Sequence, residues 1–173
     1  MRAWGAEIDC KDEAVVITGT SQGKMVNDAL CCEESGSTLR FLIPVFAMSG
    51  KPVKFTGKGR LLQRPLSVYQ NLFEENNLRV VQTGSSVEIC GPLQGKTYVV
   101  DGNVSSQFIT GLLLALPLAK EDSVLRIVPP FASKSYVGLT LKWIWRIVRI
   151  WDRFCLRQRQ WRKETVILCI RND

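Results

Sequence analysis

Two serines and a glutamine stand directly before a long apolar run in the segment NVSSQFITGLLL, which starts at Asn103. The ordinary role of a single serine in such a position is to cap a helix by accepting a backbone N–H, which is worth about 1 kcal/mol. Two adjacent hydroxyls and an amide exceed what one cap requires. Free backbone N–H groups, the helix dipole and hydroxyls together make an anion site. Ser105, Ser106 and Gln107 therefore predict a phosphate cradle at a helix start.

Two arginines indicate the same chemistry. Arg40 is expected in the first turn of a helix that follows the tripeptide SGS, and Arg64 precedes Pro65 at the expected start of another helix. A cation opposes the dipole at a helix N-terminus, and such local conflicts often mark functional sites. Either both guanidiniums pair with nearby carboxylates, or they bind a carboxylate or phosphate ligand as planar forks. The sequence leaves both interpretations open.

The remaining polar groups narrow the chemistry. Ser133 to Tyr136 (SKSY) brings hydroxyls, a lysine and a phenol before a further apolar run, although any polar loop that enters a helix would look the same. The chain contains no histidine, which excludes a histidine base and a histidine-rich metal site. Any proton transfer would fall to Lys, Asp or Glu.

Short elements must position these residues, because glycine and proline divide the chain frequently. Apolar alternation and periodicity favour an α/β or α+β domain. The helix at residues 65–75 is expected to have Pro65 at its first position. The predicted strands are residues 14–18, 51–56, 79–82, 87–90, 96–100 and 124–128, and the predicted helices are residues 38–48, 65–75 and 107–119.

An internal repeat relates two of the predicted helices. Each copy runs from small polar residues through an apolar helix and a polar turn to a strand. This pattern predicts a repetitive fold in which like helices pack side by side. The two copies are SGSTLRFLIPVFAMSGKPVKFTG and VSSQFITGLLLALPLAKEDSVLRIVP.

The C-terminal segment differs from the rest of the chain. Met1 to Lys142 hold 15 basic and 13 acidic residues, whereas Trp143 to Asp173 hold 8 basic and 3 acidic residues. The second segment also carries four of the five tryptophans and contains no glycine or proline. Such a tail could bind nucleic acid or an acidic membrane surface, or it could be a solvated, poorly ordered terminus.

The sequence favours a cytoplasmic protein. The opening MRAWGAEIDC carries acidic residues and matches neither a signal peptide nor a basic presequence. The longest apolar run, residues 112–118, is too short to cross a bilayer. The six cysteines show no CxxC spacing, so we expect reduced thiols.

Four motifs occur in the order and approximate spacing found in 3-phosphoshikimate 1-carboxyvinyltransferase, also called EPSP synthase: ESGSTLRFLIP, GRLLQRPL, DGNVSSQFITGLLLALPL and SKSYVGLTL. The chain resembles this family between Trp4 and Leu141. The resemblance implies an α/β fold of repeated βαβαββ units in two similar domains. It also implies transfer of the enolpyruvyl group of phosphoenolpyruvate to the 5-hydroxyl of shikimate 3-phosphate, with loss of phosphate and without a metal or organic cofactor.

The resemblance further assigns substrate contacts by motif. Ser105 and Ser106 would hold the phosphate of shikimate 3-phosphate, and Gln107 would contact both substrates. Ser133, with Tyr136 close by, would complete that phosphate site.

The motif residues at the other anion site would serve phosphoenolpyruvate. Gly36 would leave room for this substrate to approach the backbone, and Arg64 would pair with its anionic groups. Arg40 matches the motif arginine of the family.

The chain also departs from the family pattern. Family chains are more than twice as long, and the lysine motif of the first strands and the second domain, with its acidic general base, are not found here. Ser135 stands where proline is frequent, and Gly138 stands where an acidic residue is common. We therefore expect residues 1–142 to be part of an N-terminal domain, monomeric as in the family, with no catalytic residue of its own and negligible turnover.

The tail at residues 143–173 is interpreted by codon arithmetic. Tryptophan has a single codon, and shifting the frame by one base allows KWIWRIVRIWDRFC to be read as MDMENCPDMGPIL. The same shift allows LRQRQWRKETVILCIRND to be read as PAPAAMEEGDCHFVYTER, and the combined string resembles a segment of the second domain of the family. Our hypothesis is that the tail is translated out of frame, so its positive charge is incidental. The alternatives are a non-catalytic anion-binding remnant and, less favoured, a nucleic-acid-binding protein that uses the tail.

Overall fold

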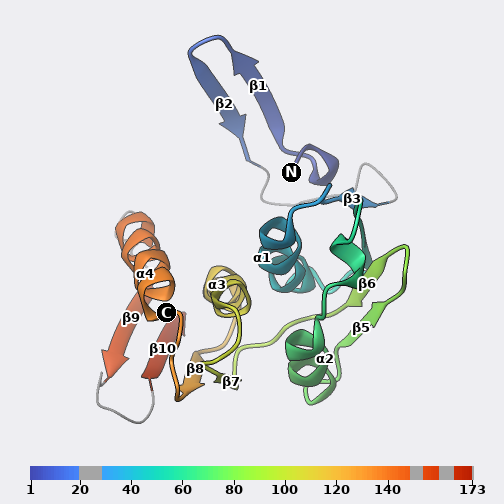
Figure 1. The fold of residues 1–173 in the computed structure, drawn as a ribbon. Coiled ribbons are helices and arrows are strands. Elements are labelled where there is room, and N and C mark those ends of the chain that lie inside the picture. The colour runs from blue at the N-terminus through green and yellow to red at the C-terminus, as the bar shows by residue number, and fades with distance from the viewer. Residues whose placement is uncertain (20–28, 149–153, 160–165, 173) are drawn as a thin grey trace.

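The chain folds into two units with the same connectivity, preceded by a hairpin (Figure 1). This computed structural model describes residues 1–19, 29–148, 154–159 and 166–172. The first unit consists of β3 (Leu30–Cys31), α1 (Gly36–Ala47), β4 (Val53–Thr56), α2 (Ser67–Glu74), β5 (Arg79–Gln82) and β6 (Val87–Cys90). The second unit consists of β7 (Thr97–Asp101), α3 (Ser106–Ala115), β8 (Ser123–Val128), α4 (Lys134–Val148), β9 (Phe154–Arg159) and β10 (Val166–Asn172).

The two sheets have matching strand orders. The first sheet runs β3-β4-β6-β5 and the second runs β7-β8-β10-β9. In each sheet the first two strands are parallel and the remaining neighbours are antiparallel. Each unit is therefore a βαβαββ repeat, which confirms the predicted α/β fold and explains the internal repeat of the sequence. The strands β9 and β10 complete the second unit.

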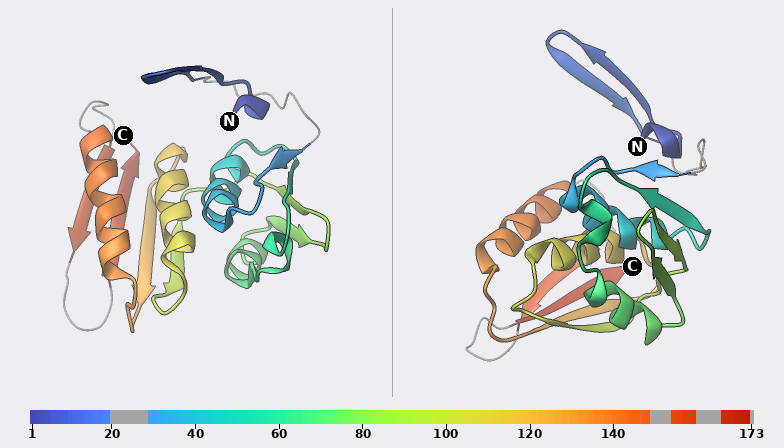
Figure 2. Two further views of the ribbon diagram at one scale, coloured as in Figure 1. Left: turned by 45° about the horizontal axis from the view of Figure 1, so that its top comes forward. Right: turned by 45° about the vertical axis from the view of Figure 1, so that its right-hand side comes forward.

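The equivalent helices α1 and α3 lie side by side between the two sheets (Figure 2). Their facing residues form one core with both sheets, and Leu39, Ile43, Ile109 and Leu112 are all at most 1% exposed. The close approach depends on Gly111 of α3, because a Cβ atom built there would lie 2.5 Å from the carbonyl oxygen of Arg40. The predicted packing of like helices is confirmed.

A short 3-10 helix, η1 (Arg2–Trp4), and a hairpin of β1 (Glu7–Lys11) and β2 (Ala14–Thr18) precede the units. The hairpin projects away from both sheets (Figure 1). The apolar side chains of Val15, Val16 and Ile17 are at least half exposed.

Several predicted boundaries shift for local reasons. The predicted helix at 38–48 begins earlier, at Gly36, because Ser35 caps it. The predicted helix at 107–119 ends at Ala115 and continues as the 3-10 helix η3 (Leu116–Leu118), because Pro117 cannot donate the next backbone hydrogen bond. The strands predicted at 14–18, 79–82 and 87–90 are confirmed, and those at 51–56, 96–100 and 124–128 differ by one or two residues.

The prediction that Pro65 starts a helix is wrong. The helix α2 begins at Ser67, and a 3-10 helix, η2 (Leu61–Gln63), lies before it. The residue Arg64 caps the C-terminal end of η2 in an extended conformation. The elements β1, β3, α4, β9 and β10 were not predicted.

The predicted tail overlaps several elements. The helix α4 continues through the predicted boundary between residues 142 and 143, and β9 and β10 lie beyond it. Residues 149–153, 160–165 and 173 of the tail lie outside the described residues. Within the described ranges, no helix has the length and apolar character needed to cross a bilayer.

Candidate functional site

The start of α1 brings two guanidiniums to one point. The side-chain oxygen of Ser35 accepts the backbone N–H of Thr38 at 3.1 Å and the hydroxyl of Thr38 at 2.7 Å. The next residue, Gly36, is buried, and a Cβ built there would lie 2.7 Å from Nη1 of Arg64 and 3.8 Å from Nη1 of Arg40. The absence of a side chain at Gly36 therefore leaves the space that both arginines approach.

Arg40 links α1 to α3. It is the fifth residue of α1 and so lies at the start of the second turn, not in the first turn as predicted. Its Nη1 donates to Oε1 of Gln107 at 2.7 Å, and its Cζ lies 4.8 Å from the ring centroid of Phe108. Burial lowers the pKa of Arg40, and the charge of Arg64 lowers it further. The site thus holds a partly desolvated cation next to a like charge.

Arg64 reaches α1 from a different element than predicted. Its backbone follows η2 and is fixed by Gln82 of β5, whose Nε2 donates to the carbonyl of Arg64 at 2.9 Å and to that of Leu62 at 2.7 Å. The expectation that Arg64 sits at the start of its own helix is therefore wrong, because α2 begins three residues later. The guanidinium instead lies at the N-terminus of α1.

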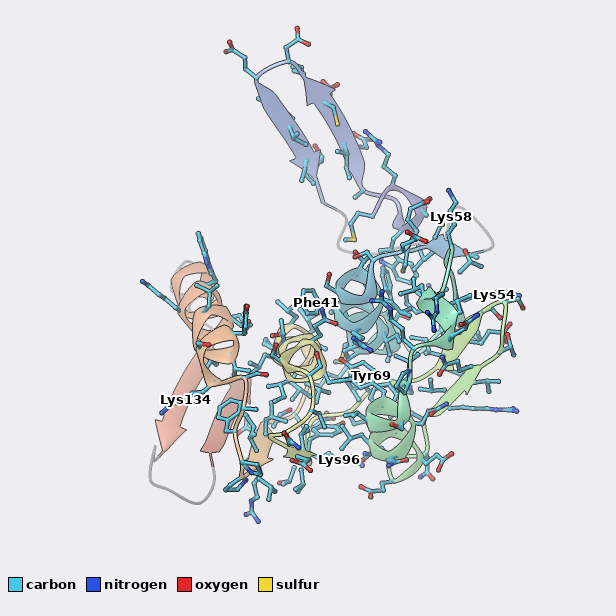
Figure 3. The ribbon with its side chains drawn as sticks, viewed as in Figure 1. Phe41, Lys54, Lys58, Tyr69, Lys96 and Lys134 are labelled. Carbon is cyan, nitrogen blue, oxygen red and sulfur yellow. The ribbon has the colours of Figure 1, made fainter. Side chains whose placement is uncertain are left out.

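Neither arginine has a carboxylate partner in the part of the chain that the structure describes. The ion pairs found there join Lys11 to Asp9, Lys54 to Glu88, and Lys58 to Glu33 (the two latter lysines are labelled in Figure 3). Among the described residues, the interpretation that Arg40 and Arg64 pair with carboxylates of the chain is therefore not supported. Two adjacent guanidiniums at the positive end of a helix are the arrangement that an anion would stabilise.

The start of α3 supplies hydroxyls. Ser105 is the N-cap, and its Oγ accepts the backbone N–H of Gln107 at 3.4 Å. Ser106 is the first helical residue. Ser105 is exposed, whereas Ser106 and Gln107 are half-buried. Through the bond from Arg40 to Gln107, the starts of α1 and α3 belong to one site.

The two remaining candidates belong to the start of α4. Ser133 directly precedes this helix, and its carbonyl accepts the N–H of Val137 at 3.3 Å. The Tyr136 side chain is 68% exposed. A hydrogen bond of 3.1 Å between the hydroxyls of Thr110 and Thr140 connects α3 and α4. Across the described ranges, no hydrogen bond joins the side chains of Ser133 or Tyr136 to the other candidates.

The sequence model of the family described as EPSP synthase (3-phosphoshikimate 1-carboxyvinyltransferase) matches residues 1–147. A 3-phosphoshikimate 1-carboxyvinyltransferase from Clostridium perfringens is 42% identical over 147 residues, which cover 83% of this chain and 35% of the relative. The chain belongs to the EPSP synthase family. The enzyme of the same name from Clostridium kluyveri is 41% identical over 143 residues, covering 82% of this chain and 34% of the relative.

A solved EPSP synthase from Acinetobacter baumannii has the same fold. The TM-score is 0.69 at 20% sequence identity, and the match covers 96% of this chain and 36% of that chain. Our chain spans about a third of the length of the curated EPSP synthases that it matches.

Two residues that shape this site were not among the candidates predicted from the sequence. Phe108 places its ring against Arg40, and Tyr69 bonds to the backbone of both helices. The position of Phe108 directly after Gln107 could have predicted a contact with an arginine of the site, because a guanidinium stacks well on an aromatic ring. Among the described residues, no three His, Cys, Asp or Glu side chains gather as a metal site would require.

Proposed function

We propose that this chain is part of a 3-phosphoshikimate 1-carboxyvinyltransferase of the shikimate pathway, which makes aromatic amino acids. The reaction moves the enolpyruvyl group of phosphoenolpyruvate to the 5-hydroxyl of shikimate 3-phosphate and releases phosphate. Membership of the EPSP synthase family supports this assignment. A monomer acting on small molecules in the cytoplasm, without a cofactor, is part of the same proposal.

The observation that carries the proposal is the pair of guanidiniums at the start of α1. Arg40 and Arg64 approach Gly36, and neither has a carboxylate partner among the described residues. Phosphoenolpyruvate carries both a phosphate and a carboxylate, so it offers oxygen atoms to two planar forks and to the helix N-terminus. Bound there, its negative charge would offset the burial and the repulsion from Arg64 that together lower the pKa of Arg40.

The second substrate would lie at the neighbouring helix start. Ser105 and Ser106 would donate hydroxyl hydrogen bonds to the phosphate of shikimate 3-phosphate, with Ser133 and Tyr136 completing that site. Gln107 would lie between the two substrates, because its amide oxygen already accepts from Arg40 and its NH₂ group is a further donor.

The proposal is tested by calorimetric titration of the full chain with each substrate. Removing Arg64 (Arg64→Ala) is expected to weaken phosphoenolpyruvate binding about 10- to 100-fold, because a charge-assisted hydrogen bond is lost. Binding of shikimate 3-phosphate should change little. The matched control is Arg60→Ala, which removes an exposed arginine four residues away.

Two results would contradict the proposal. One is equal loss of affinity in the Arg60 and Arg64 variants, which would show a general charge effect. The other is no binding of either substrate combined with DNA binding that falls steeply with salt and disappears on deletion of residues 143–173.

Turnover by the chain alone is proposed to be negligible, since proton transfer in the family is expected to need the second domain. A coupled assay of phosphate release with both substrates should give no signal above a protein-free control. Robust turnover would refute this part of the proposal while leaving the substrate assignment intact.

We also propose that residues 143–173 are translated out of frame. The family model matches residues 1–147, so the match ends five residues beyond the predicted boundary between residues 142 and 143. The encoding nucleotide sequence across Leu141 to Trp151 tests the idea, and codons that cannot yield the shifted string would discard it.

A further inference from the structure

A proline interrupts the hydrogen bonding of α1 one turn after Arg40. Pro44 lies inside α1 and is buried. In a regular α-helix the carbonyl of residue 40 accepts the N–H of residue 44, and proline has no N–H to donate. The carbonyl of Arg40 therefore needs another donor, because a buried carbonyl without a partner is destabilising.

Tyr69 of α2 supplies that donor. Its hydroxyl donates to the carbonyl of Arg40 at 2.7 Å and lies 3.0 Å from the carbonyl of Phe108. The side chain is 0% exposed, and its ring stacks on Phe73 and meets Phe108 edge-on, with centroids 5.4 Å and 4.9 Å away. Figure 3 shows Tyr69 between α2 and the pair formed by α1 and α3.

The two carbonyls that Tyr69 contacts belong to the backbone of the anion site. One is the carbonyl of Arg40 itself, and the other belongs to Phe108, the residue after Gln107. The side chains of Arg40 and Gln107 are in turn joined by their hydrogen bond of 2.7 Å. One phenol therefore sets the relative position of the two backbone segments from which these site residues extend.

We propose that Tyr69 is a positioning residue for the anion site, which holds Arg40 and Gln107 in register by replacing the donor that Pro44 lacks. The identity of the ligand of the anion site, phosphoenolpyruvate, is taken from the proposed function, and this inference rests on it in that respect. The geometric part of the inference concerns the free protein and can be tested without any ligand.

The central variant is Tyr69→Phe, which removes the hydroxyl and keeps the ring packing. The matched control is Tyr98→Phe, because Tyr98 is also buried and its hydroxyl also donates to a backbone carbonyl, that of Gln94 at 2.6 Å. Nitrogen-15 NMR of the arginine side chains measures rotation of the Arg40 guanidinium, with Arg40→Lys identifying its signals. Rotation should become faster in Tyr69→Phe and remain as in the wild type in Tyr98→Phe.

Ligand binding gives the second measurement. The dissociation constant for phosphoenolpyruvate should rise roughly tenfold in Tyr69→Phe, since Arg40 no longer holds one orientation. In Tyr98→Phe it should stay within about twofold of the wild type. Both titrations are made well below the unfolding temperature of each variant, so that stability alone cannot produce the difference.

Replacement of Pro44 tests the mechanism directly. Pro44→Ala restores a backbone N–H at residue 44, which can bond to the carbonyl of Arg40 within α1. In this background Tyr69→Phe should change phosphoenolpyruvate affinity and guanidinium rotation far less than it does in the wild type. The cycle of four proteins subtracts any cavity that Pro44→Ala leaves.

The outcomes separate this inference from the proposed function. If the wild type binds no phosphoenolpyruvate, the proposed function fails, and guanidinium rotation in the same four proteins still decides the role of Tyr69. If the wild type binds phosphoenolpyruvate but Tyr69→Phe leaves rotation and affinity unchanged, the positioning role is overturned. Equal effects of Tyr69→Phe with and without Pro44 would also overturn it, because they would show that the hydroxyl does not substitute for the missing N–H.

Discussion

Replacing Gly111 by alanine tests the contact between α1 and α3. A Cβ built at Gly111 would lie 2.5 Å from the carbonyl oxygen of Arg40 and 3.1 Å from Cγ of Pro44, and it would also collide with the hydroxyl of Tyr69. The nearest backbone atom cannot rotate away as a flexible side chain could. The two helices must therefore separate, or the clash must be absorbed as strain.

Two opposing effects set the size of the change at Gly111. Alanine is favoured over glycine inside a helix by about 1 kcal/mol. Overpacking a tight contact costs about 1–3 kcal/mol, and the upper half of that range applies because the obstruction is backbone. We expect the free energy of unfolding to fall by about 1–2 kcal/mol, which lowers Tm by about 2–8 °C for a chain of this size.

The same substitution in α4 is the matched control. Gly138 also lies inside a helix, but a Cβ built there meets no atom within 4 Å. Only the helix preference remains, so Gly138→Ala should stabilise the chain by about 0.5–1 kcal/mol. Urea unfolding followed by circular dichroism measures both variants, with the slope of the transition checked for constancy. Stabilisation by Gly111→Ala would refute the close approach of α1 and α3.

Two further predictions concern the anion site and a buried thiol. Gly36→Ala should weaken phosphoenolpyruvate binding about tenfold, because the new Cβ would lie 2.7 Å from Nη1 of Arg64 and displace the guanidinium. Tm should stay unchanged, because the end of the Arg64 side chain can move away. Unchanged affinity in a calorimetric titration would contradict the placement of Arg64. Burial, and to a lesser extent the neighbouring Cys31, raises the pKa of Cys32 from 9.0 to about 11. The folded chain then keeps a proton that the unfolded chain loses, so stability present below pH 9 declines as the pH rises toward 11. In urea unfolding at a series of pH values, Cys32→Ala should flatten the decline of stability between pH 9 and 11, whereas the control Cys90→Ala, at an exposed cysteine, should not. Equal dependence of stability on pH in the two variants would contradict the burial of the Cys32 thiol.

The sequence was sufficient for the features that depend on neighbouring residues. The repeat predicted that α1 and α3 are equivalent, and the small hydroxyl residues before each apolar run marked the two helix starts, where the structure places caps at Ser35 and Ser105. The same local reasoning predicted most strands, because alternation is a property of adjacent residues. The substrate roles of the candidate residues stay predictions.

The errors concern contacts between distant segments. Arg64 was assigned to the start of the following helix, but its guanidinium lies at Gly36 in the first helix of the unit. The hydrogen bond from Tyr69 to the carbonyl of Arg40 spans 29 residues, and apolar periodicity within one helix carries no information about such a distant partner. A combined signal was nevertheless present, since a proline inside a helix leaves a carbonyl open and a buried tyrosine needs an acceptor.

In both repeats a hydrogen bond joins the second helix to the first helix, but the bonded groups differ. In each unit the second helix bonds to the fifth residue of the first helix: Tyr69 of α2 bonds to Arg40, and Thr140 of α4 bonds to Thr110. In the second unit the bond joins two side chains, so Thr110 is occupied by holding the helices together. In the first unit the bond ends on a backbone carbonyl, which leaves the side chain of Arg40 free to reach Gln107. Because Pro44 leaves the carbonyl of Arg40 without its helical donor, the backbone of Arg40 can bond to α2 while its side chain extends to the anion site.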